Sequence, residues 1–150
     1  MFATFLLYIS CKKKKTNDKL YEESKSSDLT FYKGKDTIYN AKGGSPHGNF
    51  KLKFNSQATA SLGNDGKLPV GNNFSEGSLI VKEVYSGNEL TLYAVMKKDS
   101  KSSYASNNWV WAEYNPNGEV VYNVTELGKS CTGCHSSGTA RDFTKSFDLH

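Results

Sequence analysis

The sequence predicts a mainly β domain of the α+β class, in which an antiparallel β-sheet is accompanied by a few short helices. The chain has 150 residues, of which 37% are apolar and 13% aromatic, enough for one domain with its own core. Two pairs of β-prone runs, each joined by a turn containing Gly and Asn, predict hairpins at residues 78–97 and 109–124. Residues 50–54 alternate apolar and basic side chains, the period of a strand with one buried face.

The N-terminus resembles a bacterial lipoprotein signal. An apolar run over residues 1–9 and the small Ser10 precede Cys11, which would become the lipidated first residue of the mature protein. Tyr8 departs from the usual small aliphatic residue, and the run is too short to span a bilayer as a helix. A plain cleaved signal peptide and an apolar cytosolic N-terminus are the alternatives. The lipoprotein interpretation predicts export to the periplasmic side of a bacterial membrane.

Residues 11–27 are expected to form a polar tether between the signal peptide, residues 1–10, and the folded domain, residues 28–150. Their Lys, Glu, Ser, Asn and Asp side chains cannot bury enough surface to offset the entropy of ordering. Much of the net charge of +4 lies in residues 12–15 and the lysines that follow. Such a cluster favours an anionic membrane surface. Nucleic-acid binding is not expected, because no aromatic interleaving or binding motif accompanies the lysines.

Short elements are expected in the first part of the domain. β-prone pieces and a Gly- and Pro-containing loop occupy residues 28–48. Asn55 or Ser56 can cap a short helix over residues 57–62, which Gly63 ends. No repeat or long amphipathic helix is expected anywhere in the chain.

The first hairpin contains a lysine that does not fit its surroundings. Ile80, Lys82 and Val84 share one face of the strand, and the intervening residues share the other, so both faces should be largely covered. Lys82 is therefore out of place, unless it lies on an edge strand and reaches water along its own stem.

A helical segment is expected over residues 125–137, and it contains the sequence Cys131-Thr132-Gly133-Cys134-His135. Each thiol of such a motif can add to a haem vinyl group while the histidine ligates the iron, so the spacing predicts one haem c near the C-terminus. A disulfide or redox pair, half of a zinc site, or chance are the alternatives. The sequence offers neither a βαβ context nor a second ligand pair for them. Residues 143–149 are expected to close the domain.

A β-rich domain with a C-terminal haem motif resembles cytochrome P460 and its relative cytochrome c′-β. The segments that carry the resemblance are 45–48, 74–83, 94–97, 108–109, 131–135 and 142–143. The resemblance implies a largely antiparallel β fold, a homodimer and a five-coordinate haem. Its open face would take small nitrogen compounds, nitric oxide or hydroxylamine.

The resemblance also assigns roles to individual residues. His135 corresponds to the proximal iron ligand, and Cys131 and Cys134 to the thioether attachments. Lys82 falls on the lysine that, in cytochrome P460, is joined covalently to the porphyrin edge. This would give the misplaced lysine a function.

The distal side of the haem distinguishes the two activities. Phe50 and Phe74 fall where the family places residues over the distal face, and these are phenylalanines in gas-binding members; ordinary core packing is the alternative for each. Hydroxylamine oxidation requires a distal carboxylate to accept protons, and its expected position near Tyr93 or Ala94 has no acid. The sequence therefore favours nitric oxide binding, with weak or absent hydroxylamine oxidation. The acids that remain to be tested are Glu76, Glu83 and Glu89.

Two further classes of protein stay open. In a six-coordinate electron-transfer cytochrome, Met96 or His47 would supply the second axial ligand, whereas their ordinary roles would be core packing and a solvated loop position. A lipoprotein without haem is the other class. A redox partner is expected for the haem-binding alternatives.

Overall fold

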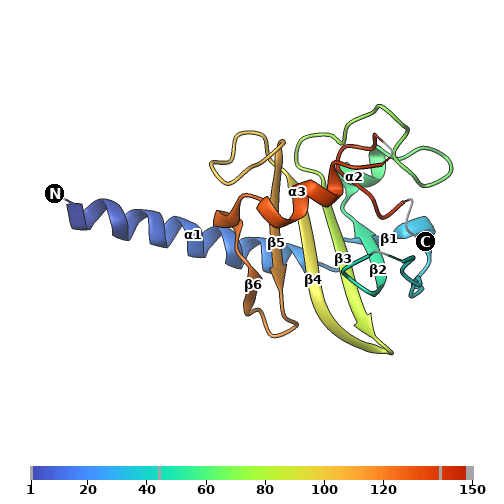
Figure 1. Ribbon diagram of the computed structural model, residues 1–150, viewed down its shortest axis with the longest axis horizontal. Coiled ribbons are helices and arrows are strands. Elements are labelled where there is room, and N and C mark those ends of the chain that lie inside the picture. The colour runs from blue at the N-terminus through green and yellow to red at the C-terminus, as the bar shows by residue number, and fades with distance from the viewer. Residues whose placement is uncertain (1, 44, 139, 148–150) are drawn as a thin grey trace.

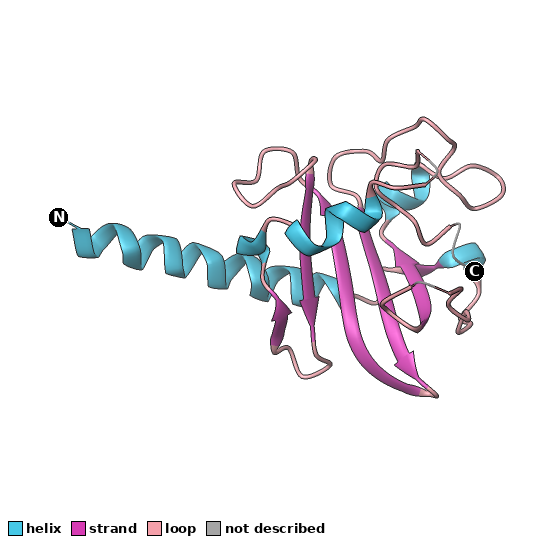
Figure 2. Cartoon of the chain, in the orientation of Figure 1, coloured by secondary structure: helices cyan, strands magenta, loops and turns pink. Residues whose placement is uncertain are grey.

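The protein, described from a computed structural model that covers residues 2–43, 45–138 and 140–147, contains a single six-stranded sheet within those ranges. The strand order β1-β2-β3-β4-β5-β6 follows the chain, and every pair is antiparallel (Figures 1 and 2). The strands are β1 Thr30–Phe31, β2 Asn49–Phe54, β3 Leu79–Ser86, β4 Glu89–Lys98, β5 Trp109–Tyr114 and β6 Val120–Tyr122. The predicted fold class is therefore confirmed.

Five helical segments accompany the sheet in the described part of the chain. They are α1 Phe2–Ser24, η1 Tyr32–Gly34, α2 Ser56–Ala60, η2 Val124–Glu126 and α3 Lys129–His135. Asn55 caps α2, because its side chain accepts a hydrogen bond of 3.0 Å from the Ala58 N–H. The predicted helical stretch over residues 125–137 exists as η2 followed by α3.

The two faces of the sheet carry separate apolar clusters. Figure 1 shows α3 crossing one face, while α1 lies along the other. On the α3 side the cluster includes Phe50, Leu52, Phe54, Ile80, Met96, Trp109, Trp111 and Phe147. On the α1 side it includes Leu20, Leu79, Val81, Val95, Val110, Tyr114 and Val124. The alternation of side chains along each strand produces this division. Of the closing segment predicted at residues 143–149, residues 148 and 149 lie outside the described ranges.

The polar segment predicted to be a tether belongs to a long helix, which the sequence analysis did not anticipate. α1 has 23 residues, and Asn17, Leu20 and Ser24 on one of its faces are 4%, 3% and 0% exposed. Tyr21 donates a 2.6 Å hydrogen bond to the Pro116 carbonyl at the β5–β6 turn. This face uses amide, hydroxyl and aromatic contacts, so a search for apolar periodicity detects only Leu20. None of the described helices is both long and apolar enough to cross a bilayer.

Candidate functional site

A cavity of about 370 Å³ lies between the sheet and α3. One row of side chains across the sheet forms much of its floor. Lys82 on β3 pairs with Leu52 on β2 and with Ala94 on β4, and Ala94 in turn pairs with Glu113 on β5. All four residues line the cavity. The small Ala94 leaves room between the longer side chains of Lys82 and Glu113.

Helix α3 brings the cysteine and histidine residues to the opposite wall. Cys131, Cys134 and His135 all line the cavity, because positions three and four residues apart share one helical face. Gly128 precedes the helix with φ 64°, and a Cβ at this position would lie 2.5 Å from Trp111 Cδ1. The glycine thus allows both the left-handed conformation and the close approach of α3 to the sheet.

One ring nitrogen of His135 is hydrogen-bonded within the protein, and the other is available to a ligand. Its Nδ1 lies 2.6 Å from the carbonyl oxygen of Phe143. Because a carbonyl only accepts hydrogen bonds, the proton resides on Nδ1, and Nε2 keeps its lone pair. Burial lowers the pKa of His135 from 6.5 to about 4. A neutral imidazole oriented in this way is what a haem iron requires.

Lys82 is a buried amine that faces the same cavity. Lys82 is 8% exposed, and its Nζ lies 4.0 Å from the centre of the Phe50 ring. No carboxylate pairs with it among the described residues. Burial lowers the pKa of Lys82 from 10.5 to about 8. β3 has a partner strand on each side, so the edge-strand explanation for Lys82 is wrong.

The cavity also contains a carboxylate that the sequence analysis missed. Glu113 Oε1 lies 3.2 Å from His47 Nε2, and both side chains are 21% exposed and line the cavity. The expected position of such an acid was in β4, near Tyr93 or Ala94. Ala94 does face the cavity, but the acid is its neighbour across the sheet on β5. The sequence correctly has no acid at Tyr93 or Ala94, but Glu113 was not considered as a cavity acid. His47, expected in a solvated loop, is partly buried and lies against Glu113.

The three acids singled out from the sequence do not line the cavity. Glu83 lies on the α1 face, where its Oε1 is 2.5 Å from Lys53 Nζ. Glu76 accepts a 2.8 Å hydrogen bond from the Ser100 N–H, and Glu89 is exposed at the start of β4. Glu113 could have been found from the alternation of β5, which places it on the same face as Trp111.

Apolar side chains complete the cavity wall. Leu52, Ile80, Leu92 and Met96 are among the lining residues. The two phenylalanines predicted to cover the distal face are not among them. Phe50 is fully buried, and its ring contacts the Lys82 amine. Phe74 is 3% exposed and packs edge-on against Trp109, with ring centres 5.8 Å apart. The structure thus brings Phe50 near the site and leaves Phe74 in the core.

The donor set fits a haem c better than the alternatives. Burial raises the pKa of Cys131 to about 11, whereas a redox-active cysteine pair requires a lowered pKa. Both motif cysteines are free thiols, and no cluster of three His, Cys, Asp or Glu side chains in the described ranges is arranged to hold a metal ion. Trp111 Nε1 is buried without a hydrogen-bond partner among the described residues and belongs to a ring that lies 4.9 Å from His135. An aromatic wall, two thiols and a neutral imidazole therefore surround one space.

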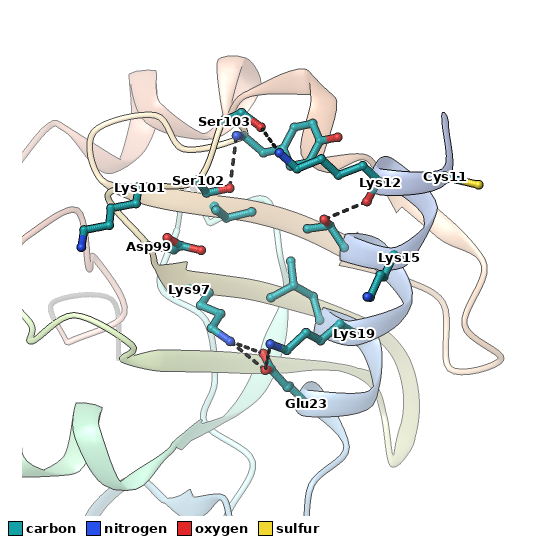
Figure 3. A pocket seen from close by; sticks show the side chains of 14 residues that line it. Cys11, Lys12, Lys15, Lys19, Glu23, Lys97, Asp99, Lys101, Ser102 and Ser103 are labelled. Atoms are coloured by element: carbon teal, nitrogen blue, oxygen red, sulfur yellow. Dashed lines mark hydrogen bonds and ion pairs between the residues drawn. The ribbon is translucent and has the colours of Figure 1, made fainter. Parts of the chain in front are cut away.

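A second hollow, on the α1 side, has a different chemistry. This groove of about 610 Å³ lies between α1 and residues 97–104 (Figure 3). Cys11 stands at one end, and lysines line the groove at positions 12, 15, 19, 97 and 101. Lys97 Nζ is 2.7 Å from Glu23, whose carboxylate also lies 3.8 Å from Lys19. No histidine lines it.

Comparison with models of protein families gives a match. The family model described as Cytochrome P460 matches residues 32–145. The matched region runs from η1 through the sheet and α3 to the segment that contacts His135, and it leaves α1 outside. A search of curated proteins found no match to the chain.

Proposed function

The chain belongs to the cytochrome P460 family of haem-binding cytochromes, and on this premise we propose that it carries one haem c. Cys131 and Cys134 would attach the haem, and His135 Nε2 would ligate its iron. The observation that carries the proposal is the hydrogen bond of 2.6 Å between His135 Nδ1 and Phe143 O, which leaves Nε2 available beside two thiols. When bound, the haem would supply an iron that binds small nitrogen compounds and exchanges electrons with them.

We propose hydroxylamine oxidation as the activity that the cavity supports best. Oxidation of hydroxylamine to nitroxyl releases two protons and two electrons. The Glu113 carboxylate faces the cavity and can accept a proton there, and His47 at 3.2 Å can pass it toward solvent because both side chains are partly exposed. The electrons would leave to a redox partner, a one-electron carrier protein. This revises the sequence-based expectation of weak hydroxylamine turnover, which depended on the absence of a cavity acid.

Nitric oxide binding is the second candidate function. The apolar wall formed by Leu52, Ile80, Leu92 and Met96 favours a small neutral ligand. Nitric oxide binding does not require Glu113, because a diatomic ligand that only binds releases no proton.

Substitution of Glu113 distinguishes the two functions. Glu113→Gln keeps the shape of the side chain and removes the proton acceptor, so hydroxylamine-dependent reduction of an acceptor dye should fall by about 10²–10⁴-fold. Nitric oxide binding to the reduced protein should stay at the wild-type level. Glu76→Gln, outside the cavity, is the matched control. Wild-type turnover that is negligible, or that Glu113→Gln leaves intact, would overturn the oxidation proposal.

We further propose that Lys82 forms a covalent bond to the haem edge. The support is its position in the cavity, its lack of a carboxylate partner among the described residues, and its lowered pKa of about 8. A lower pKa increases the fraction of neutral amine, which is the form that can bond to carbon. Forming the C–N bond would break one N–H bond of the amine and one C–H bond of the haem edge, and it would release two protons and two electrons. The electrons would leave to the same one-electron carrier protein, in two steps.

We propose that the protein is a lipoprotein exported to the periplasmic side of a bacterial membrane. Cys11 is exposed, and the lysines of the Figure 3 groove begin directly beside it, where they would face the anionic headgroups of the anchoring membrane. Mass spectrometry of the mature N-terminus tests this. An acylated Cys11 is expected, and an unmodified chain beginning at Met1 would contradict it.

We also propose a homodimer. β6 is the last strand of the sheet, and Val120 and Val121 on it are 38% and 52% exposed. An edge strand with exposed apolar residues is a surface that a second copy can cover. Light scattering should give twice the chain mass, and Val121→Lys should shift it toward the monomer.

A further inference from the structure

A buried charge network is centred on Asp142, the residue before the one whose carbonyl accepts a hydrogen bond from the proposed haem ligand. Both oxygens of the Asp142 carboxylate accept hydrogen bonds of 2.7 Å from Lys98 Nζ. Trp109 Nε1 donates to Oδ1 at 3.2 Å, and the Phe74 N–H donates to Oδ2 at 2.9 Å. The Lys98 and Asp142 side chains are only 8% and 4% exposed. One residue of the C-terminal segment is thus tied to β4, to β5 and to the loop before β3.

The backbone at this network adopts a conformation that needs external support. Asp142 and Phe143 have φ angles of 49° and 65°, and residues other than glycine rarely adopt this left-handed region. Two such residues in succession persist only where the surrounding structure holds them. Here the Thr144 N–H donates a 2.9 Å hydrogen bond to the Arg141 carbonyl and closes the turn, and the bonds to the Asp142 carboxylate anchor the turn to the sheet. The resulting turn directs the Phe143 carbonyl back toward α3, where it meets His135 Nδ1 at 2.6 Å.

We propose that Asp142 and Lys98 are positioning residues for His135. Their ion pair holds the turn at residues 142–143, and the turn holds the Phe143 carbonyl on Nδ1. The orientation of the imidazole, and the electron density that Nε2 offers to a ligand, therefore depend on an ion pair that does not touch the imidazole. The inference rests on the proposed haem c for its effect on iron, but the proton position on His135 can be measured without haem.

The hydrogen bond to Nδ1 has a defined electronic consequence. A carbonyl that accepts the Nδ1 proton makes the imidazole a stronger donor at Nε2. A stronger axial donor stabilises ferric over ferrous iron and therefore lowers the reduction potential. Weakening this bond should raise the potential and lower the frequency of the iron–histidine stretching vibration.

The test replaces the ion pair with neutral groups of similar size. Asp142→Asn combined with Lys98→Met leaves no unpaired buried charge, and asparagine tolerates the left-handed conformation. The matched control is Lys53→Met with Glu83→Gln, which removes an ion pair of 2.5 Å on the opposite face of the sheet. Lys98→Arg keeps the charge pair and should behave as wild type.

The expected result is specific to the Asp142 variant. In the haem-loaded protein, Asp142→Asn/Lys98→Met should raise the reduction potential and lower the ferrous iron–histidine stretching frequency measured by resonance Raman spectroscopy. The control Lys53→Met/Glu83→Gln should change neither quantity. Folded Asp142→Asn/Lys98→Met protein with wild-type values of both would overturn the proposal.

A second measurement covers the case in which the variant or the wild type takes up no haem. In haem-free wild-type protein, nitrogen-15 NMR of His135 should show the proton on Nδ1, whereas the Asp142 variant should show both tautomers in exchange. Wild-type protein with the proton on Nε2, or a variant that keeps a single Nδ1–H tautomer, would contradict the positioning role. Absence of haem with the expected tautomers would contradict the proposed function and leave the positioning role supported.

Discussion

Lys82 and Glu113 lie in one row of the sheet, separated by Ala94, which pairs with both. Two strand spacings separate their backbones, roughly 10 Å. The Lys82 amine and the Glu113 carboxylate therefore lie on two sides of the cavity floor. The short side chain of Ala94 between them leaves the space above β4 open. This arrangement comes from the register of three strands, and it determines what the cavity can hold.

Filling the gap between these residues should block the site. Ala94→Phe places a ring in the cavity floor, and we expect the protein to fold but to incorporate little haem, because the new ring takes space that the cofactor needs. Extra volume at this position should cost about 1–3 kcal/mol of stability. The measurement is the ratio of haem absorbance to protein mass.

Thr91→Phe serves as the control for this substitution, since Thr91 is an exposed residue of the same strand. Normal haem content in Ala94→Phe, with a cooperative unfolding transition, would contradict the location of the site.

Burial of Lys82 should make the stability of the haem-free protein depend on pH. Its pKa is about 8 in the folded protein and near 10.5 when exposed, so the charged form is disfavoured by folding. The destabilisation is present in full below pH 8 and disappears as the pH rises toward 10.5. At pH 7, Lys82→Met should therefore raise the free energy of unfolding by up to about 3 kcal/mol.

Urea unfolding of wild type and Lys82→Met across this pH range measures the effect. The difference between the two proteins should shrink from pH 8 upward, whereas the exposed Lys101→Met should show no such trend. A Lys82→Met difference that stays constant to pH 10.5 would show that Lys82 is not desolvated.

The Lys82 bond to haem predicts a particular peptide. Trypsin digestion of the haem-loaded protein should release the haem joined both to the Cys131–Cys134 segment and to the segment around Lys82. Lys82→Arg should leave the haem on the cysteine segment alone. Wild-type protein that yields only the cysteine-linked haem peptide would rule out the crosslink.

The sequence predicted the hairpins and the site wall on α3 because these depend on local patterns. Turn residues and alternation specify β3–β4 and β5–β6, Asn55 specifies the start of α2, and the spacing of Cys131, Cys134 and His135 places them on one helical face. Lys82 was detectable as a polar residue in a strand whose other residues are apolar.

The remaining features depend on contacts between distant segments. Glu113 reaches the site through the pairing of β4 with β5, whose register is set across the loop at residues 99–108. Helix α1 docks through polar contacts of Asn17 and Tyr21 and buries Ser24, so an apolar period in the sequence does not mark this face. The Phe143 carbonyl bond to His135 depends on a left-handed turn that composition does not reveal.

Two glycines near α3 should respond in opposite directions to alanine. Gly128→Ala adds a Cβ that would lie 2.5 Å from Trp111 and requires a positive φ, so it should destabilise the protein by about 1–3 kcal/mol. Gly133→Ala lies inside α3 with no atom within 4 Å of the new Cβ, and it should stabilise by up to about 1 kcal/mol. Thermal unfolding of the haem-free variants measures both. Equal effects of the two substitutions would contradict the close packing of α3 on Trp111.

The central claim is that Cys131, Cys134 and His135 form a covalent haem site, and haem staining after denaturing electrophoresis tests it most directly. Protein produced together with haem-attachment machinery should carry haem that migrates with the chain, and Cys131→Ala with Cys134→Ala should abolish the stain. Removal of Cys11 should leave it unchanged. A wild-type band that does not stain, beside a control cytochrome that does, would contradict the account.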